Sequence, residues 1–98
     1  MKIWLDDLRP AENIDYVVCA TAEQAIALIN LGDVTFISFD HDLGEGLTGY
    51  DVAKFIEEGA HTGSIRPIFY KIHSANPVGR KNIEFAMNSA LDAWRKMK

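Results

Sequence analysis

The sequence predicts an α/β fold in which about four mostly parallel strands carry three helices. Short segments rich in β-branched and aromatic residues alternate with segments of helical periodicity, in the order strand, strand, helix, strand, helix, strand, helix. This alternation is typical of a mostly parallel sheet in a layered sandwich. The 98 residues, 48% of them hydrophobic, suit one domain over residues 1–98 with a modest core.

The strands are predicted at residues 2–5, 15–20, 34–39 and 67–72. The third is almost entirely apolar or β-branched, as expected for a strand that is covered on both faces. About nine residues join the first two strands, which is short for a parallel crossover. Either a tight loop replaces the usual helix at this point, or the second strand pairs differently.

Capping signals mark the starts of the three helices. Thr21 with Gln24, and Thr48 with Asp51, have the spacing at which a side chain caps the first turn. Apolar residues recur behind both signals at helical spacing, with a glycine after the first helix. The last helix is predicted over residues 77–98, where a proline occupies the first turn.

The overall composition excludes several classes of protein. A net charge of −4 argues against general binding to nucleic acids or to anionic membranes, since both need a basic surface. The N-terminal segment lacks a long apolar stretch, and no segment reaches membrane-spanning length. The single cysteine, Cys19, cannot form an internal disulfide. We therefore expect a cytoplasmic protein without a membrane partner.

Acidic and polar side chains follow three of the predicted strands at the point where each strand ends. They are Asp6 and Asp7 after the first strand, Asp40 and Asp42 after the third, and His73 and Ser74 after the fourth. In open parallel sheets, ligands bind beyond the carboxyl ends of the strands, near the point where the strand order reverses. We therefore expect these side chains to meet at one edge of the sheet.

The four carboxylates would repel one another unless a cation lay among them. Asp6, Asp7, Asp40 and Asp42 are therefore candidate metal ligands, and Mg²⁺ is the first choice because it prefers oxygen donors. The nearby histidines leave Mn²⁺ open as well. The alternative is that some of these aspartates only cap loops or helix starts, as Asp commonly does.

Two histidines at such an edge could act as general base and general acid in phosphodiester cleavage. His41 and His73 are the candidates, because each neighbours an acid or a hydroxyl at the end of a strand. With Asp40 they form the predicted catalytic group, and water activated by the metal would be the nucleophile. His61 lies in a predicted loop and is interpreted as an ordinary surface residue.

The segment "SANPVGRKN" predicts a phosphate-binding site at the start of the last helix. Ser74, Asn76, Arg80 and Lys81 stand where free backbone N–H groups and the helix dipole favour anions. The segment lacks P-loop spacing, and simple helix capping with solvated basic residues is the alternative. Arg9, from the loop beside the first two aspartates, is a further candidate for binding phosphate.

The layout resembles that of response-regulator receiver domains. In that family, an acidic pair after the first strand binds Mg²⁺, an aspartate after the third strand accepts a phosphoryl group, and a Ser or Thr contacts it. Asp6-Asp7, Asp40 and Ser74 occupy the matching positions. Among the predicted elements, we expect no counterpart of the first receiver helix, of the fifth strand with its lysine, or of the helix after it. The resemblance implies a truncated, flavodoxin-like, three-layer sandwich, and it leaves phosphoryl signalling through Asp40 as an alternative.

A closer resemblance is to the compact group known as cyclic-phosphate processing receiver domains. The segments "WLDDLRP", "FDHDLG", "TGYDV" and "HSANPVGRKN" are similar to its signature segments, in order along nearly the whole chain. Membership would imply metal-dependent hydrolysis of a cyclic phosphate or a cyclic nucleotide, so that the partner would be a phosphate-containing small molecule or an RNA end. A binding module without catalysis is the other alternative. The open edge of the fourth strand could also support a homodimer.

Overall fold

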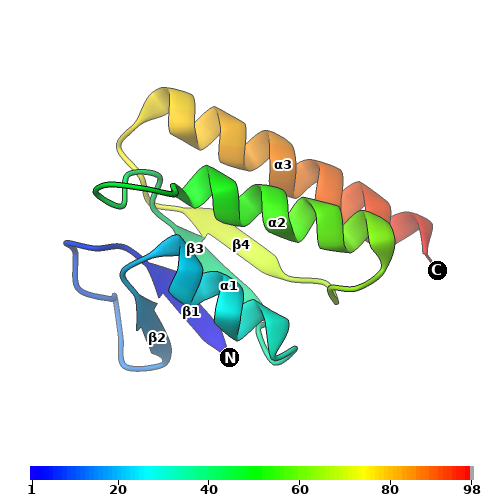
Figure 1. Ribbon diagram of the computed structural model, residues 1–98, viewed down its shortest axis with the longest axis horizontal. Coiled ribbons are helices and arrows are strands. Elements are labelled where there is room, and N and C mark those ends of the chain that lie inside the picture. Colours follow the sequence, from blue (N-terminus) through cyan, green and yellow to red (C-terminus); the bar gives the residue numbers. More distant parts are fainter. Residues whose placement is uncertain (98) are drawn as a thin grey trace.

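The computed structural model describes residues 1–97 and contains one parallel sheet and three helices (Figure 1). The strands pair in the order β2-β1-β3-β4, all parallel. In chain order the elements are β1 (Lys2–Leu5), β2 (Tyr16–Cys19), α1 (Ala22–Asn30), β3 (Phe36–Phe39), α2 (Gly49–Thr62), β4 (Phe69–Ile72) and α3 (Pro77–Lys96). The predicted α/β class, with four parallel strands and three helices, is confirmed.

The order of the strands explains why the helices gather on one face of the sheet. The connections from β2 to β3 and from β3 to β4 run in one direction across the sheet, and each contains a helix. The connection from β1 to β2 runs in the opposite direction. Because parallel crossovers are right-handed, connections of opposite direction lie on opposite faces. Figure 1 accordingly shows the three helices side by side in one layer, with α2 between α1 and α3.

The hydrophobic core lies between this helical layer and the sheet. Ile3, Leu5, Ile37 and Phe39 alternate along the central strands and share the helical face of the sheet, where all four are fully buried. Each helix contributes one apolar face to the same cluster, for example through Ile29, Ile56 and Ile83. The core therefore fixes the sheet from one side and leaves the carboxyl ends of the strands accessible.

The loop of residues 6–15 covers the second face of the sheet. Trp4 and Ser38 point to this face, since they alternate with the core residues, and both are buried. The loop is tied down by a hydrogen bond from Trp4 Nε1 to the Arg9 carbonyl (3.0 Å) and by a bond from Lys71 Nζ to Glu12 Oε1 (2.6 Å). A tight loop thus replaces the crossover helix, and the second covering layer is an ordered loop.

The predicted elements are found, with small differences at their ends. β2, β3 and β4 are shorter than predicted by one or two residues at one or both ends, as is usual at strand boundaries. Both capping boxes form as predicted, with Thr21 accepting from the Gln24 backbone and Thr48 accepting from the Asp51 backbone. α3 ends at Lys96, and residue 98 of its predicted span lies outside the described residues.

β4 lies at one edge of the sheet, as the dimer hypothesis requires, but one of its backbone carbonyls already has a side-chain partner. Phe69 is 68% exposed, whereas Arg80 Nη1 donates to the carbonyl of Ile72 (3.0 Å). Pairing with a second copy of the chain stays a prediction. Among residues 1–97, no helix has both the length and the apolar character needed to cross a bilayer.

The capping box at Thr21 provides a test of how far local interactions stabilise the fold. Substitution Thr21→Ala removes the hydroxyl that accepts the Gln24 backbone N–H (3.1 Å), and we expect it to lower the free energy of unfolding by about 1 kcal/mol. In a domain of this size, that loss corresponds to a fall in Tm of roughly 4–8 °C. Urea unfolding and thermal unfolding measure both quantities. Thr21→Ser keeps the hydroxyl and is the control. An equal loss in both variants would contradict the capping role.

Candidate functional site

Three carboxylates converge at the carboxyl ends of the two central strands. Asp6 and Asp7 follow β1, and Asp40 follows β3, which is hydrogen-bonded to β1 along its length. Their ligand atoms all lie within 4.8 Å of one another. After β1 the chain continues to β2 on one side, and after β3 it continues to β4 on the other, so the strand order reverses between β1 and β3. The cluster lies at this reversal, which is where ligands bind in open α/β sheets. Asp42, the fourth predicted ligand, lies outside this group.

Asp6 is buried, with 3% of its surface exposed, and is held by three hydrogen bonds. Its Oδ1 accepts the backbone N–H groups of Leu8 (2.8 Å) and Arg9 (2.9 Å), and its Oδ2 lies 2.9 Å from His73 Nε2. Burial alone would raise the pKa of Asp6, but the two backbone donors and His73 outweigh it and lower that pKa. Asp6 is therefore held in its ionised form inside the structure.

Asp40 behaves in the opposite way. Burial and the negative charge of Asp6 raise the pKa of Asp40, although the His41 backbone N–H, the charge of His73 and the Ser74 hydroxyl act against that rise. Two neighbouring carboxylates with pKa values shifted in opposite directions are typical of sites that bind a cation or exchange a proton. A divalent cation would remove the part of this rise that comes from repulsion by Asp6. The residues present therefore fit a cation with oxygen ligands.

His73 is fixed by contacts on every side. Its Nε2 lies against Asp6, its Nδ1 lies 2.8 Å from the hydroxyl of Ser38, and its ring stacks on Trp4 with centroids 4.0 Å apart. Its carbonyl accepts a hydrogen bond from Arg9 Nη1 (3.1 Å). Both ring nitrogens are therefore engaged within the protein. The structure places His73 beside the acidic cluster, as predicted, but without a free ring nitrogen.

His41 lies in a second group, at the start of α3. Its Nδ1 lies 3.0 Å from Asp42 Oδ1 and 3.4 Å from Asn76 Nδ2, and Asn76 Nδ2 also donates to Asp42 Oδ2 (3.3 Å). Hydrogen bonding from His41 and Asn76 lowers the pKa of Asp42. A Cβ atom at Gly79 would overlap the imidazole, so that glycine allows α3 to begin directly against the ring. Among the described residues, His41 Nε2 has no hydrogen-bond partner.

The predicted phosphate-binding residues surround the turn between β4 and α3. Asn76 caps α3 by accepting the Gly79 backbone N–H (2.9 Å), and Ser74 Oγ accepts from the Asn76 backbone (3.1 Å). Arg80 Nη1 donates to the carbonyls of Ile72 (3.0 Å) and Ser74 (3.1 Å), which stabilises the turn. Lys81, the fifth residue of α3, is exposed. The alternative interpretation of this segment, helix capping by Asn76, is therefore observed. Phosphate binding by the same residues stays a prediction.

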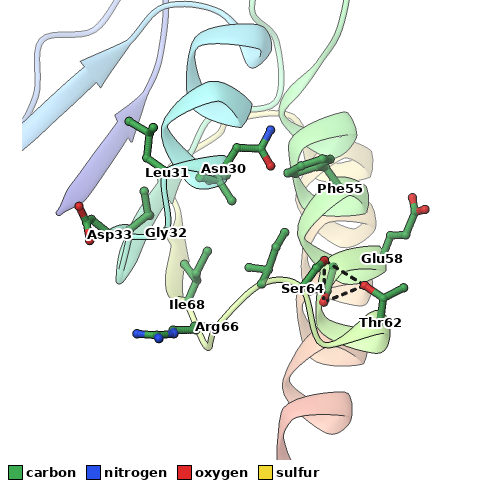
Figure 2. Close-up of a pocket in the computed structure, with 14 residues that line it drawn as sticks. Asn30, Leu31, Gly32, Asp33, Phe55, Glu58, Thr62, Ser64, Arg66 and Ile68 are labelled. Carbon is green, nitrogen blue, oxygen red and sulfur yellow. Dashed lines mark hydrogen bonds between the residues drawn. The ribbon is translucent and has the colours of Figure 1, made fainter.

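A separate cavity of about 470 Å³ lies at the opposite end of the sheet (Figure 2). The end of α1, the second half of α2 and the segments that lead into β3 and β4 line it. Its acidic residues, Asp33 and Glu58, stand on opposite sides of the cleft in Figure 2 and do not converge. None of the predicted site residues lines this cavity. The predicted site residues therefore collect at the carboxyl ends of the strands and not in this cavity.

The family "Cyclic-phosphate processing Receiver domain" matches residues 1–89. The chain belongs to this family. A search of curated proteins and a search of solved structures gave no significant match. The family match spans the acidic cluster, both histidines of the site and the turn before α3, so that all predicted site residues lie inside the matched range.

Two residues of the site in this receiver-like domain, Ser38 and Trp4, were not predicted from the sequence. Ser38 is completely buried within β3, and its hydroxyl contacts His73. A polar residue within an otherwise apolar strand was the available signal, because a buried hydroxyl requires a partner. The partner could not be identified without the register, which places Ser38 opposite Lys71 and two positions before the level of His73.

The raised pKa of Asp40 predicts that this residue destabilises the cation-free domain. Its ionised form is disfavoured by folding, so the penalty is present in full above the raised pKa of the folded state. It declines as the pH falls below that pKa and vanishes below the ordinary carboxyl pKa of the unfolded chain. Asp40→Asn is therefore expected to increase the free energy of unfolding at pH 7, measured by urea in the presence of a chelator. The gain should shrink in acid, where Asp40 becomes protonated in the folded protein.

Asp42→Asn is the matched control, because the pKa of Asp42 is lowered and its ionised form is favoured by folding. This substitution is expected to leave stability at pH 7 unchanged or to reduce it. A loss of stability in Asp40→Asn at pH 7 without cation would contradict the penalty inferred from burial of Asp40 and from its repulsion by Asp6.

Proposed function

We propose that this receiver-like domain uses a divalent cation, Mg²⁺ or alternatively Mn²⁺, to hydrolyse a cyclic phosphate or a cyclic nucleotide. The observation that carries the proposal is the convergence of Asp6, Asp7 and Asp40 within 4.8 Å, in a chain whose family is described by cyclic-phosphate processing. The substrate would be a small phosphate-containing molecule or an RNA end that carries a cyclic phosphate. The net charge of −4 agrees with a small ligand better than with an extended nucleic acid.

The three carboxylates suit such a cation in number, chemistry and access. All three offer oxygen atoms, which Mg²⁺ prefers, and only part of its coordination shell needs to come from the protein. Asp6 is buried and fixed, whereas Asp7 is exposed, so that the cluster is rigid on one side and open to solvent on the other. When bound, the cation would polarise the phosphate and make water a better nucleophile.

The side chains around the cluster have complementary roles in this proposal. The Ser74 hydroxyl, beside Asp40, and the exposed Lys81 would contact phosphate oxygens, with Arg9, Arg80 and Asn76 shaping the two loops that flank them. His41 would transfer the proton, because Asp42 orients its Nδ1 while its Nε2 lacks a partner among residues 1–97.

Asp40 also supports a second candidate function, in which it accepts a phosphoryl group. In signalling receivers, the corresponding aspartate accepts a phosphoryl group, and the neighbouring hydroxyl of Ser74 agrees with that chemistry. This variant needs no cyclic substrate and predicts a covalent phosphate on Asp40. The experiment below therefore includes a small phosphodonor as a separate arm.

The test is incubation with 2′,3′-cyclic nucleotides and with cyclic dinucleotides, with and without Mg²⁺ or Mn²⁺, followed by chromatography of the products. We expect turnover that requires the cation and that falls by about 10²-fold or more in Asp40→Ala and in His41→Ala. His61→Ala is the matched control. Its imidazole bonds only to Ser89 (2.9 Å) among the described residues and belongs to neither group of the site.

Three outcomes separate the alternatives. Binding of a cyclic nucleotide without turnover would replace the hydrolase by a binding module. Incorporation of phosphate on Asp40 from a small phosphodonor, without hydrolysis of any cyclic substrate, would indicate signalling. Turnover that survives in Asp40→Ala would show that the reaction takes place elsewhere.

A further inference from the structure

A chain of hydrogen bonds connects the interior of the sheet to the acidic cluster. The hydroxyl of Ser38 lies 2.8 Å from His73 Nδ1, and His73 Nε2 lies 2.9 Å from Asp6 Oδ2. Ser38 is fully buried, and the His73 and Asp6 side chains are 11% and 1% exposed. The three residues come from β3, from the end of β4 and from the end of β1, so this series of hydrogen bonds joins three strands.

The direction of the hydrogen bond between His73 and Asp6 follows from the chemistry of the two groups. An ionised carboxylate can only accept, so Asp6 requires a proton on His73 Nε2. The Ser38 hydroxyl can either donate to Nδ1 or accept from it, so it gives Nδ1 a partner while Nε2–H points at Asp6.

Further contacts fix the plane and the position of the ring. The imidazole and the indole of Trp4 are parallel within 4°, with their centroids 4.0 Å apart. Trp4 Nε1 donates to the carbonyl of Arg9, whose Nη1 donates in turn to the carbonyl of His73. The backbone N–H of His73 donates to the carbonyl of Phe39 (2.9 Å). The ring is thus held by stacking, by its backbone and by both of its nitrogens.

The consequence for Asp6 is a fixed carboxylate with one acceptor position left. A carboxylate offers about four lone-pair positions, and Leu8, Arg9 and His73 occupy three of them. Since Leu8 and Arg9 both bind Oδ1, the remaining position is on Oδ2, next to His73. The hydrogen bond from His73 therefore sets the orientation of the oxygen that remains for a ligand.

We propose that His73 is a positioning residue, which orients Asp6 for cation binding and is itself oriented by Ser38 and Trp4. This role differs from that of a general acid or base, for which a ring nitrogen would have to face the substrate. This inference rests on the proposed function, because His73 would orient Asp6 for the same cation. Partners of this kind, one step behind a metal ligand, typically change metal affinity by about 10–100-fold when they are removed.

Two measurements on the intact chain test the proposal. The first is a long-range ¹H–¹⁵N correlation spectrum of the ¹⁵N-histidine-labelled protein at pH 7.5. It is expected to show a proton on Nε2 of His73. A ring protonated at Nδ1 alone would overturn the assigned direction. This readout needs neither cation nor substrate.

The second measurement is the Kd for Mn²⁺, obtained by titration calorimetry. His73→Ala is expected to raise the Kd about 10-fold or more, and His73→Gln should recover most of the affinity because its amide N–H can replace Nε2–H. Ser38→Ala, a small change inside the sheet, should weaken binding less than His73→Ala. His61→Ala should leave the Kd unchanged.

The outcomes distinguish the inference from the proposed function. A Kd that is the same in His73→Ala and wild type, with turnover lost, would make His73 a catalytic residue and overturn its positioning role. Cation binding that depends on His73, in a protein that turns over no cyclic phosphate, would keep the inference and remove the hydrolase. A wild-type protein that binds no divalent cation would overturn both.

Discussion

The buried carboxylate of Asp6 connects parts of the molecule that are far apart in the sequence. One of its oxygens accepts two backbone N–H groups and so begins the loop of residues 6–15, while the other meets His73 at the end of β4. The loop in turn covers Trp4 and Ser38 on the face of the sheet that has no helix. Since a buried carboxylate without partners would be strongly unfavourable, burial of Asp6 depends on these contacts. The second covering layer and the candidate site therefore depend on the same group.

The carboxylates at the ends of β1 and β3 have pKa values that are shifted in opposite directions. Asp6 is stabilised as an ion by its donors, whereas burial and the charge of Asp6 disfavour ionisation of Asp40 nearby. A domain with a core as small as this one has little stability in reserve. Repulsion between carboxylates in such a domain is therefore informative, because functional sites commonly retain interactions that stability alone would remove. A bound cation would convert this repulsion into attraction.

The fold was predictable from the sequence because its signals are local. Alternating strands and helices, the capping boxes at Thr21 and Thr48, and the proline at the start of α3 each specify their own element. The convergence of Asp6, Asp7 and Asp40 also followed, because parallel strands bring their carboxyl ends to one edge. The question left open by the short connection between the first two strands needed the structure, which shows parallel pairing across a tight loop.

What the sequence could not provide was the detailed partnership of each side chain. His41 and His73 looked equivalent in the sequence, yet one faces Asp42 at a helix start and the other lies between Ser38 and Asp6. Similarly, Arg80, a predicted phosphate ligand, donates to the carbonyls of its own turn, a contact that the sequence did not reveal. Such differences depend on register and on side-chain direction across the sheet, which no local pattern encodes.

The central claim is that a divalent cation binds where β1 and β3 end. Paramagnetic broadening by Mn²⁺ in ¹H–¹⁵N spectra of the labelled chain tests it most directly, because broadening falls steeply with distance from the ion. We expect substoichiometric Mn²⁺ to broaden the amides of residues 6–9, 40–43 and 73–75, and excess Mg²⁺ to restore them. Amides around Asp33 and Glu58, beside the cavity at the opposite end of the sheet, should be unaffected. Broadening centred on that cavity, or none at either end, would contradict the account.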